Sequence, residues 1–154
     1  MPDKKSPQLK QLIAGLQEDL SREYQAVIAY TVYSNVLTGA QWMDIARELK
    51  KHAGEELQHA MIIADQLDYL GEMPNASPKP VKLSKKAEDM LRFDLENDKT
   101  TIANYRRRIK QADELEEWAL SEDLREILRD EFDHLNALAT ALGEDTPDPG
   151  VASE

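Results

Sequence analysis

The sequence predicts an all-α protein, on the strength of three observations. Leu, Ala, Glu and Lys are abundant, while the 154 residues include only 6 Gly. Apolar residues recur at steps of three and four along four long segments, which is the spacing of one helical face. The turn-forming Gly and Pro residues lie between these segments. A chain of 17.5 kDa fits a single domain, so we expect one antiparallel four-helix bundle over residues 1–143.

The first two segments predict a helical hairpin. Ser6 followed by Pro7 is typical of a helix start, because Ser can accept a free N–H and Pro lacks one. This helix is expected over residues 7–37. After Gly39 a second apolar stripe continues over residues 40–70 and stops at a glycine.

The second pair of segments predicts another hairpin. Residues 72–83 contain three prolines and form a long crossover that no helix can run through. We expect Ser84 to cap a helix over residues 85–116, and Ser121 to cap a last helix that ends at Gly143. The tail over residues 144–154, rich in Pro and acids, is expected to be disordered.

Charge and composition exclude several classes of function. Asp and Glu total 30 against 19 Lys and Arg, which gives a net charge of -11 and disfavours a nucleic-acid partner. The chain has no Cys, so disulfides, iron–sulfur clusters and thiolate metal sites are excluded. We see no signal peptide and no apolar stretch of membrane-spanning length, and we expect a cytoplasmic protein without membrane contact.

Acids and histidines occupy core-facing positions of the apolar stripes. Two helices carry a Glu-x-x-His motif, which places a carboxylate and an imidazole side by side on one face. The other two helices each place one acid at mid-length between apolar residues. The six residues are Glu23, Glu56, His59, Asp98, Glu131 and His134.

These residues repeat at a fixed offset along the chain. The acid of the first helix in each half precedes the motif Glu by 33 residues, and the two halves are offset by 75. The matched pairs are Glu23 with Asp98, Tyr30 with Tyr105, Glu56 with Glu131, and His59 with His134. Such a repeat predicts two related hairpins around a pseudo-twofold axis, with the six residues on that axis.

The chemistry of this set favours two divalent metal ions. Four carboxylates in one low-dielectric interior with only two imidazoles would be costly without cations, which weighs against a purely structural polar core. Mixed carboxylate and imidazole ligands suit iron, with manganese as the alternative. Tyr30 and Tyr105 could hydrogen-bond to ligands, pass electrons or simply pack. His52, one turn before the first motif, could support the site or lie on a polar helix face.

Three stretches resemble bacterioferritins, namely residues 70–75, 90–95 and 126–131. The similarity extends over about residues 8–142 and implies a ferritin-like bundle with a ferroxidase centre. It further implies that Glu56 and Glu131 bridge two iron ions per subunit, that Glu23 and Asp98 are terminal ligands, and that His59 and His134 bind opposite metals. By this resemblance the same six residues are both the metal ligands and the catalytic residues.

The chain departs from the bacterioferritin pattern in three places. Bacterioferritins have Glu where this chain has Asp98, so we expect weaker binding of the second metal. The haem-ligating Met position holds Leu57, so no haem is expected. The tail, with Pro147 and Pro149, cannot form the fifth helix of the bacterioferritin shell.

The resemblance implies oxidation of Fe(II) by dioxygen or hydrogen peroxide, for iron storage or detoxification. The alternatives are a di-iron or di-manganese peroxidase or catalase without storage, and a metal-stabilised helical scaffold. The absence of Cys excludes a rubrerythrin with its own rubredoxin domain, and mini-ferritins of the Dps type fit less well because they build the iron site between subunits. We expect a homo-oligomer, with a dimer and shells of 12 or 24 subunits left open.

Overall fold

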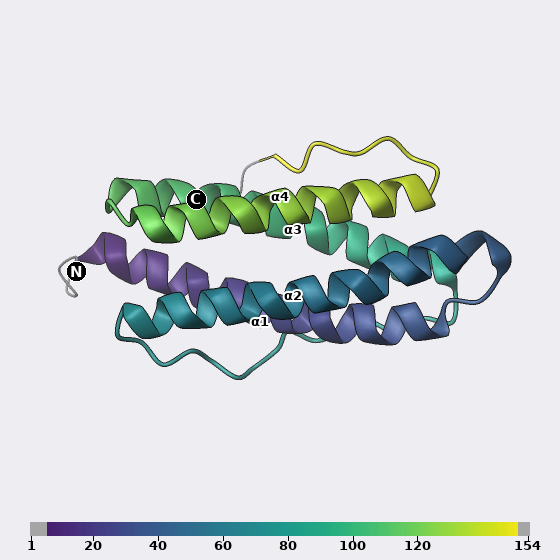
Figure 1. Cartoon of the computed structure of the whole chain (residues 1–154), viewed down its shortest axis with the longest axis horizontal. Helices are drawn as coiled ribbons and strands as arrows, with labels where there is room; N and C mark the ends of the chain where they lie inside the picture. Colours follow the sequence, from purple (N-terminus) through teal and green to yellow (C-terminus); the bar gives the residue numbers. More distant parts are fainter. Residues whose placement is uncertain (1–5, 151–154) are drawn as a thin grey trace.

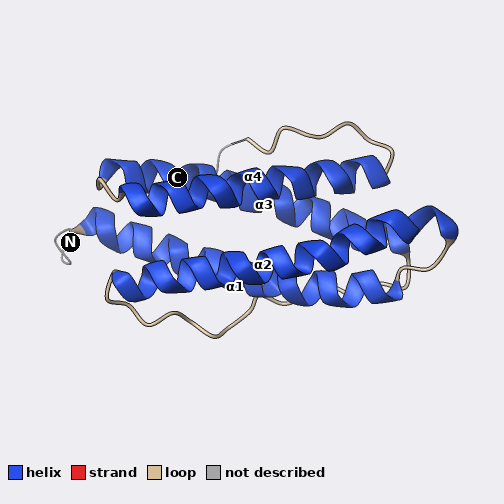
Figure 2. Ribbon diagram, in the orientation of Figure 1, coloured by secondary structure: helices blue, strands red, loops and turns tan. Residues whose placement is uncertain are grey.

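The computed structural model, which describes residues 6–150, is an all-α four-helix bundle, as expected (Figures 1 and 2). Its helices are α1 (Pro7–Val36), η1 (Ala40–Trp42), α2 (Met43–Tyr69), α3 (Ala87–Glu114) and α4 (Trp118–Ala141). Helix α1 packs on α2 and α3 on α4, and the two hairpins meet through α1 with α3 and α2 with α4. This arrangement confirms the two hairpins predicted from the apolar stripes.

The first hairpin closely follows the sequence signals. The Ser6 hydroxyl accepts the Leu9 N–H at 3.1 Å, and Pro7 occupies the first helical turn. Gly39 has a φ of 117°, which an L side chain rarely adopts, and it separates α1 from the next helix. The second helix was expected from residue 40, but residues 40–42 form a 3₁₀ turn and the α-helix begins at Met43.

Helix α4 begins four residues earlier than expected, at Trp118, and Ser121 does not cap it. Instead, Ser121 is buried and its hydroxyl donates to Asp113 Oδ1 at 2.6 Å, which ties α4 to the end of α3. Ser84 was expected directly before its helix, but two residues separate it from the first residue of α3. Its hydroxyl oxygen accepts the Lys86 N–H at 3.1 Å, and α3 begins at Ala87. The Ser84 hydroxyl also donates to Asp89 Oδ2 at 2.8 Å, so it joins the connection to the first turn of α3. Ser121 joins the first turn of α4 to the end of α3.

The long crossover between α2 and α3 lies along α1 in Figure 1. Asn75 anchors it, because its amide donates to the Gln17 carbonyl oxygen at 2.8 Å and its own carbonyl oxygen accepts the Tyr24 hydroxyl. Further along, the Lys79 N–H donates to the Ser21 carbonyl oxygen at 3.1 Å. The prolines prevent a helix here, and these contacts give the extended backbone its partners.

Residues 144–150 contain no helix and run back over α3 and α4 (Figure 1). Arg92 donates to Glu144 at 2.9 Å, and Arg106 donates to the Gly150 carbonyl oxygen at 2.7 Å. The expected disorder of the whole tail stays a prediction, and its last four residues lie outside the described part of the chain.

The apolar core is divided into two parts by a polar layer at mid-length. One part joins the first half of α1 to the end of α2, and the other joins the second half of α1 to the start of α2. Fully buried leucines mark the two parts, with Leu12 and Leu67 in one and Leu49 and Leu135 in the other. An apolar layer therefore encloses the polar layer on each side. None of the helices described is long and apolar enough to cross a lipid bilayer.

Candidate metal centre

All six sequence-predicted residues lie in the polar layer between the two apolar parts, and each is at most 4% exposed. We refer to Glu23, Glu56, His59, Asp98, Glu131 and His134 as the central cluster. The helical period decides which acids face the core. Glu96, two residues before Asp98, lies on another face of α3, because its side chain is 58% exposed and pairs with Lys99. Each helix thus presents its polar residue inward at the same level.

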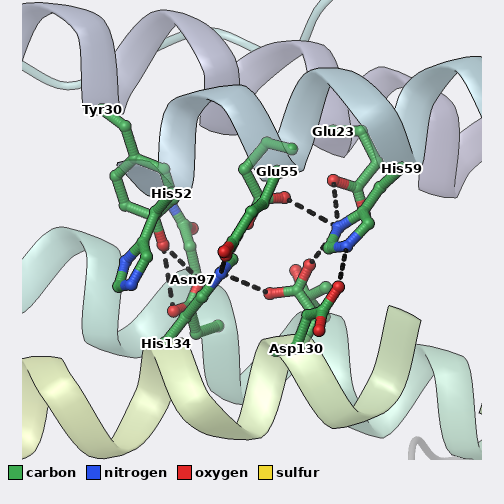
Figure 3. Close-up of polar contacts among 12 residues, drawn as sticks. Glu23, Tyr30, His52, Glu55, His59, Asn97, Asp130 and His134 are labelled. Atoms are coloured by element: carbon green, nitrogen blue, oxygen red, sulfur yellow. Dashed lines mark hydrogen bonds and ion pairs between the residues drawn. The ribbon is translucent and has the colours of Figure 1, made fainter. Parts of the chain in front are cut away.

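One half of the central cluster surrounds the imidazole of His59. Its Nδ1 atom lies 3.7 Å from a Glu23 oxygen, 3.5 Å from a Glu56 oxygen and 3.3 Å from a Glu131 oxygen (Figure 3). One ligand atom from each of these four residues lies within 4.8 Å of the others, so a single cation could contact all four.

The other half surrounds His134. Asp98, Glu131 and His134 form a second set whose ligand atoms lie within 4.8 Å of one another. His134 Nδ1 also lies 2.6 Å from Glu56 Oε1 and 3.6 Å from Glu131 Oε2. Glu131 therefore belongs to both sets, and Glu56 contacts both imidazoles.

The two terminal acids each accept a hydrogen bond from a tyrosine of the opposite hairpin. The Tyr30 hydroxyl lies 3.0 Å from both oxygens of Asp98, and the Tyr105 hydroxyl donates to Glu23 Oε1. Both tyrosines are fully buried. Of the two roles left open by the sequence, the structure therefore shows hydrogen bonding to the acids of the cluster.

Sequence reasoning missed two carboxylates that contact the outer nitrogen atoms of the histidines. His59 Nε2 lies 2.9 Å from Asp130 Oδ2, and His134 Nε2 lies 2.5 Å from Glu55 Oε2. A carboxylate at this position favours a proton on Nε2 and leaves Nδ1 free to face the cluster. The signal was present, because Glu55 and Asp130 are offset by the same 75 residues as the rest of the repeat.

Burial and mutual repulsion keep protons on some of the acids. Burial raises the pKa of Glu56 well above its usual value, and the nearby charges of Glu131 and Glu23 add to the effect. Burial and Glu131 likewise raise the pKa of Asp98. For Glu131, hydrogen bonds from His134 and His59 outweigh burial and lower the pKa below its usual value.

The acids around the two imidazoles raise the pKa values of His134 and His59. Burial alone would lower the pKa of His134, but hydrogen bonds to Glu131 and Glu56 raise it to about 12. The same kinds of contact raise the pKa of His59 well above its usual value. Without metal, the central cluster is therefore stabilised by protons on both imidazoles and on part of its carboxyl groups.

The donor atoms of the central cluster fit two divalent cations. Several of its buried atoms lack a hydrogen bond of acceptable geometry, namely Glu23 Oε2, Glu56 Oε1, Glu131 Oε1, His59 Nδ1 and His134 Nδ1. Buried polar atoms are normally satisfied, so these five atoms, which face one another only as ion pairs, fit the ligand atoms of bound cations. Two dications would offset four carboxylates, and oxygen with imidazole donors suits iron or manganese.

Two further buried polar residues lie beside the cluster. His52 is 3% exposed, and its ring stacks on that of His134 with centroids 3.9 Å apart. Burial and the neighbouring His134 lower the pKa of His52 to about 3, so this imidazole is neutral. Asp94, which sequence reasoning also missed, is 3% exposed, and its Oδ2 has no hydrogen-bond partner.

Asp94 has a counterpart at the same 75-residue offset, namely Asp19. Asp19 is satisfied by a buried ion pair with Arg108, whose Nε lies 2.7 Å from Asp19 Oδ2. The position that matches Arg108 in the other half is Tyr33, a neutral side chain whose hydroxyl donates to the Lys82 carbonyl oxygen. The two halves of the bundle therefore differ in how they compensate this buried acid.

Comparison with known proteins agrees with the geometry. The ferritin-like domain profile matches residues 13–146. A bacterioferritin of Brucella melitensis is 24% identical over 132 residues, covering 85% of this chain and 82% of the relative. A bacterial ferritin of Synechocystis sp. is 25% identical, covering 86% of each chain.

Solved structures show the same fold. A ferritin-like, diiron-carboxylate protein of Bacillus anthracis superposes with a TM-score of 0.85 at 30% identity, covering 89% of this chain and 99% of that one. A bacterioferritin-related protein of Bacteroides fragilis, described as a dodecameric thioferritin, gives a TM-score of 0.80 at 26% identity, covering 87% and 85%. With its four helices, its inward Glu-x-x-His motifs and a profile match over most of its length, the chain belongs to the ferritin-like family.

Proposed function

We propose that the central cluster binds two iron ions and that the protein is a ferroxidase, which oxidises Fe(II) with dioxygen or hydrogen peroxide for iron storage or detoxification. The observation that carries the proposal is the sharing of Glu131 between two sets of ligand atoms, with Glu56 in contact with both imidazoles. Shared carboxylates hold two cations at a short separation, so that one oxidant molecule can take an electron from each.

The residues have distinct roles in this proposal. Glu56 and Glu131 would bridge the two ions, Glu23 and His59 would complete one side, and Asp98 and His134 would complete the other. Manganese is the alternative metal, and no haem is expected because Leu57 offers no ligand atom.

The surrounding side chains maintain the ligands in the form that binds metal. Asp130 and Glu55 accept the protons of the outer histidine nitrogens, which orients Nδ1 toward the ions. The tyrosines fix the terminal carboxylates, and the two apolar layers keep bulk water out. Loading displaces the protons that stabilise the metal-free cluster.

The test is turnover of Fe(II) followed by the ferric absorption after mixing with air or with peroxide under argon. The wild-type protein should oxidise added Fe(II) faster than buffer does, and Glu131→Ala should lose that acceleration. If the wild-type rate matches the buffer rate with both oxidants, the ferroxidase proposal is wrong.

We also propose that the protein is a homo-oligomer. A monomeric mass measured by light scattering would contradict this proposal.

A further inference from the structure

A small cavity of about 10 Å³ lies between α1 and α3, directly beside the central cluster. Its lining includes the four carboxylates of the cluster, together with Arg22 and Tyr30. A volume of this size holds about one water-sized molecule. Dioxygen and hydrogen peroxide are near this limit, so the cavity is a candidate position for the oxidant in the proposed reaction.

Arg22 extends across the α1–α3 boundary at this cavity. Its Nη2 atom donates to the Asn97 carbonyl oxygen at 2.9 Å and to the Thr101 hydroxyl at 3.2 Å, which fixes the plane of the guanidinium. Its Nε atom is buried and has no hydrogen-bond partner. A buried donor of a fixed cation is costly to leave unsatisfied, so a small acceptor in the cavity would stabilise it.

The two sides of the central cluster differ in the charged groups that they present. On the α2–α4 side, the carboxylates of Glu55 and Asp130 are 34% and 40% exposed and would attract a divalent cation. On the α1–α3 side, the cavity lining includes the Arg22 cation together with the carboxyl group of Asp94, whose Oδ2 has no hydrogen-bond partner. A small oxygen species that accepts a hydrogen bond would therefore meet a cationic donor on the α1–α3 side.

We propose that Arg22 is a positioning residue for hydrogen peroxide, which it holds in the α1–α3 cavity by a hydrogen bond from Nε–H. The proposal rests on the proposed ferroxidase function and specifies its oxidant. In the balanced reaction, two Fe(II) and one hydrogen peroxide take up two protons and give two Fe(III) and two water molecules. The O–O bond breaks, each iron supplies one electron, and the guanidinium stabilises the negative charge that develops on oxygen.

Dioxygen gains little from the same donor, because it is apolar and a weak hydrogen-bond acceptor. The decisive quantity is therefore the ratio of the Fe(II) oxidation rate with peroxide to the rate with air. In Arg22→Gln this ratio should fall about tenfold or more, the effect of one hydrogen bond from a charged donor. Lys99→Gln removes a half-buried cation of α3 that pairs with Glu96, and it should leave the ratio unchanged.

Arg22→Lys is the second variant, and it keeps the charge while it removes the fixed Nε–H donor. It should lower the ratio in the same direction as Arg22→Gln. A merely structural role for Arg22 predicts that both rates fall together, and that result would overturn the proposal, as would an unchanged ratio in both variants.

Fluoride binding to the Co(II)-loaded protein provides a readout without turnover. Fluoride is a water-sized anion that accepts hydrogen bonds, so its Kd should rise about tenfold in Arg22→Gln while Lys99→Gln matches the wild type. An equal Kd in all three proteins would contradict the placement of the donor. If Co(II) binds but Fe(II) is never oxidised, the ferroxidase function fails while the fluoride measurement still decides the role of Arg22.

Discussion

At the scale of single residues, the carboxylates that contact Nε2 of the two histidines are expected to orient these ligands toward the metals. Asp130→Asn keeps the size of the side chain but removes the charge that accepts the His59 Nε2 proton. Loss of such a partner typically costs about 10-fold to 100-fold in metal affinity. We expect that loss at one of the two metals, measured by anaerobic Co(II) titration.

Asp133→Asn is the matched control, because Asp133 is exposed on the same helix one residue before His134. It should bind metal like the wild type. Equal affinities for Asp130→Asn and wild type would show that this hydrogen bond does not support the ligand.

Asp98 is the second test at this scale. Its side chain is one methylene shorter than Glu, so the metal on the His134 side should bind more weakly than the other. Asp98→Glu should tighten that metal and Asp98→Asn should weaken it, as measured by the second step of the same titration. Glu96→Ala is the control, since Glu96 is exposed and pairs only with Lys99 among the contacts described. Loss of Fe(II) oxidation in Glu96→Ala but not in Asp98→Asn would mean that α3 presents a different ligand.

The six residues of the central cluster were predictable because helix periodicity fixes which face each one occupies. Arg22 and Asp94 were not, because their significance depends on what lies opposite. Arg22 is next to Glu23 in sequence, but only the packing of α1 on α3 places its guanidinium on Asn97 and Thr101. Asp94 matches Asp19 at the 75-residue offset, and only the fold shows that Asp19 pairs with Arg108 while Asp94 Oδ2 has no hydrogen-bond partner.

At the scale of the elements, Gly15 in α1 allows the close approach of α3. A Cβ atom at this position would overlap the guanidinium of Arg108, which pairs with the buried Asp19. Gly15→Ala should therefore displace Arg108 and leave Asp19 without its cation. Breaking such a pair costs about 3–5 kcal/mol, from which the better helix propensity of Ala subtracts about 1 kcal/mol.

The expected net loss in the free energy of unfolding is about 2–4 kcal/mol, measured by urea denaturation. Gly54→Ala in α2 is the control, because no atom lies within 4 Å of the added Cβ, and it should stabilise the protein slightly. A Gly15→Ala protein as stable as the wild type would show that Arg108 finds another position without cost.

Helix ends were less predictable than helix faces. Ser6 is a cap as expected, but Ser121 has the same local sequence signal and bonds to Asp113 instead. The difference is tertiary, because Ser121 is buried against the end of α3, where a hydroxyl can join two helices. The Ser6 hydroxyl is only partly buried and bonds within its own helix. A capping residue in a tight turn between helices is therefore a weaker signal than one at the start of a hairpin.

At the scale of the whole molecule, the titration of the central cluster links metal binding to stability. The pKa values of Glu56, Asp98, His59 and His134 are all raised in the folded, metal-free protein. Their stabilising effect is complete below the pKa of the unfolded groups and is lost as pH rises above it. For the imidazoles the loss starts near pH 6.5, their usual pKa.

We therefore expect the Tm of the metal-free protein to fall between pH 6 and pH 9. The Zn(II)-loaded protein should change less, because its ligands have already released their protons. The increase in Tm on loading should thus be larger at pH 9 than at pH 6, measured by calorimetry on dialysed samples. An increase that is the same at both values would contradict proton displacement.

A two-metal centre is tested most directly by anaerobic Fe(II) or Co(II) titration of the wild-type protein and Glu56→Ala. We expect a break at two equivalents per chain for the wild type, because two sets of ligand atoms share Glu131. Glu56→Ala should lose at least one of the two, since Glu56 contacts both imidazoles. A break at one equivalent or none in the wild type, with Glu56→Ala behaving identically, would contradict a two-metal centre.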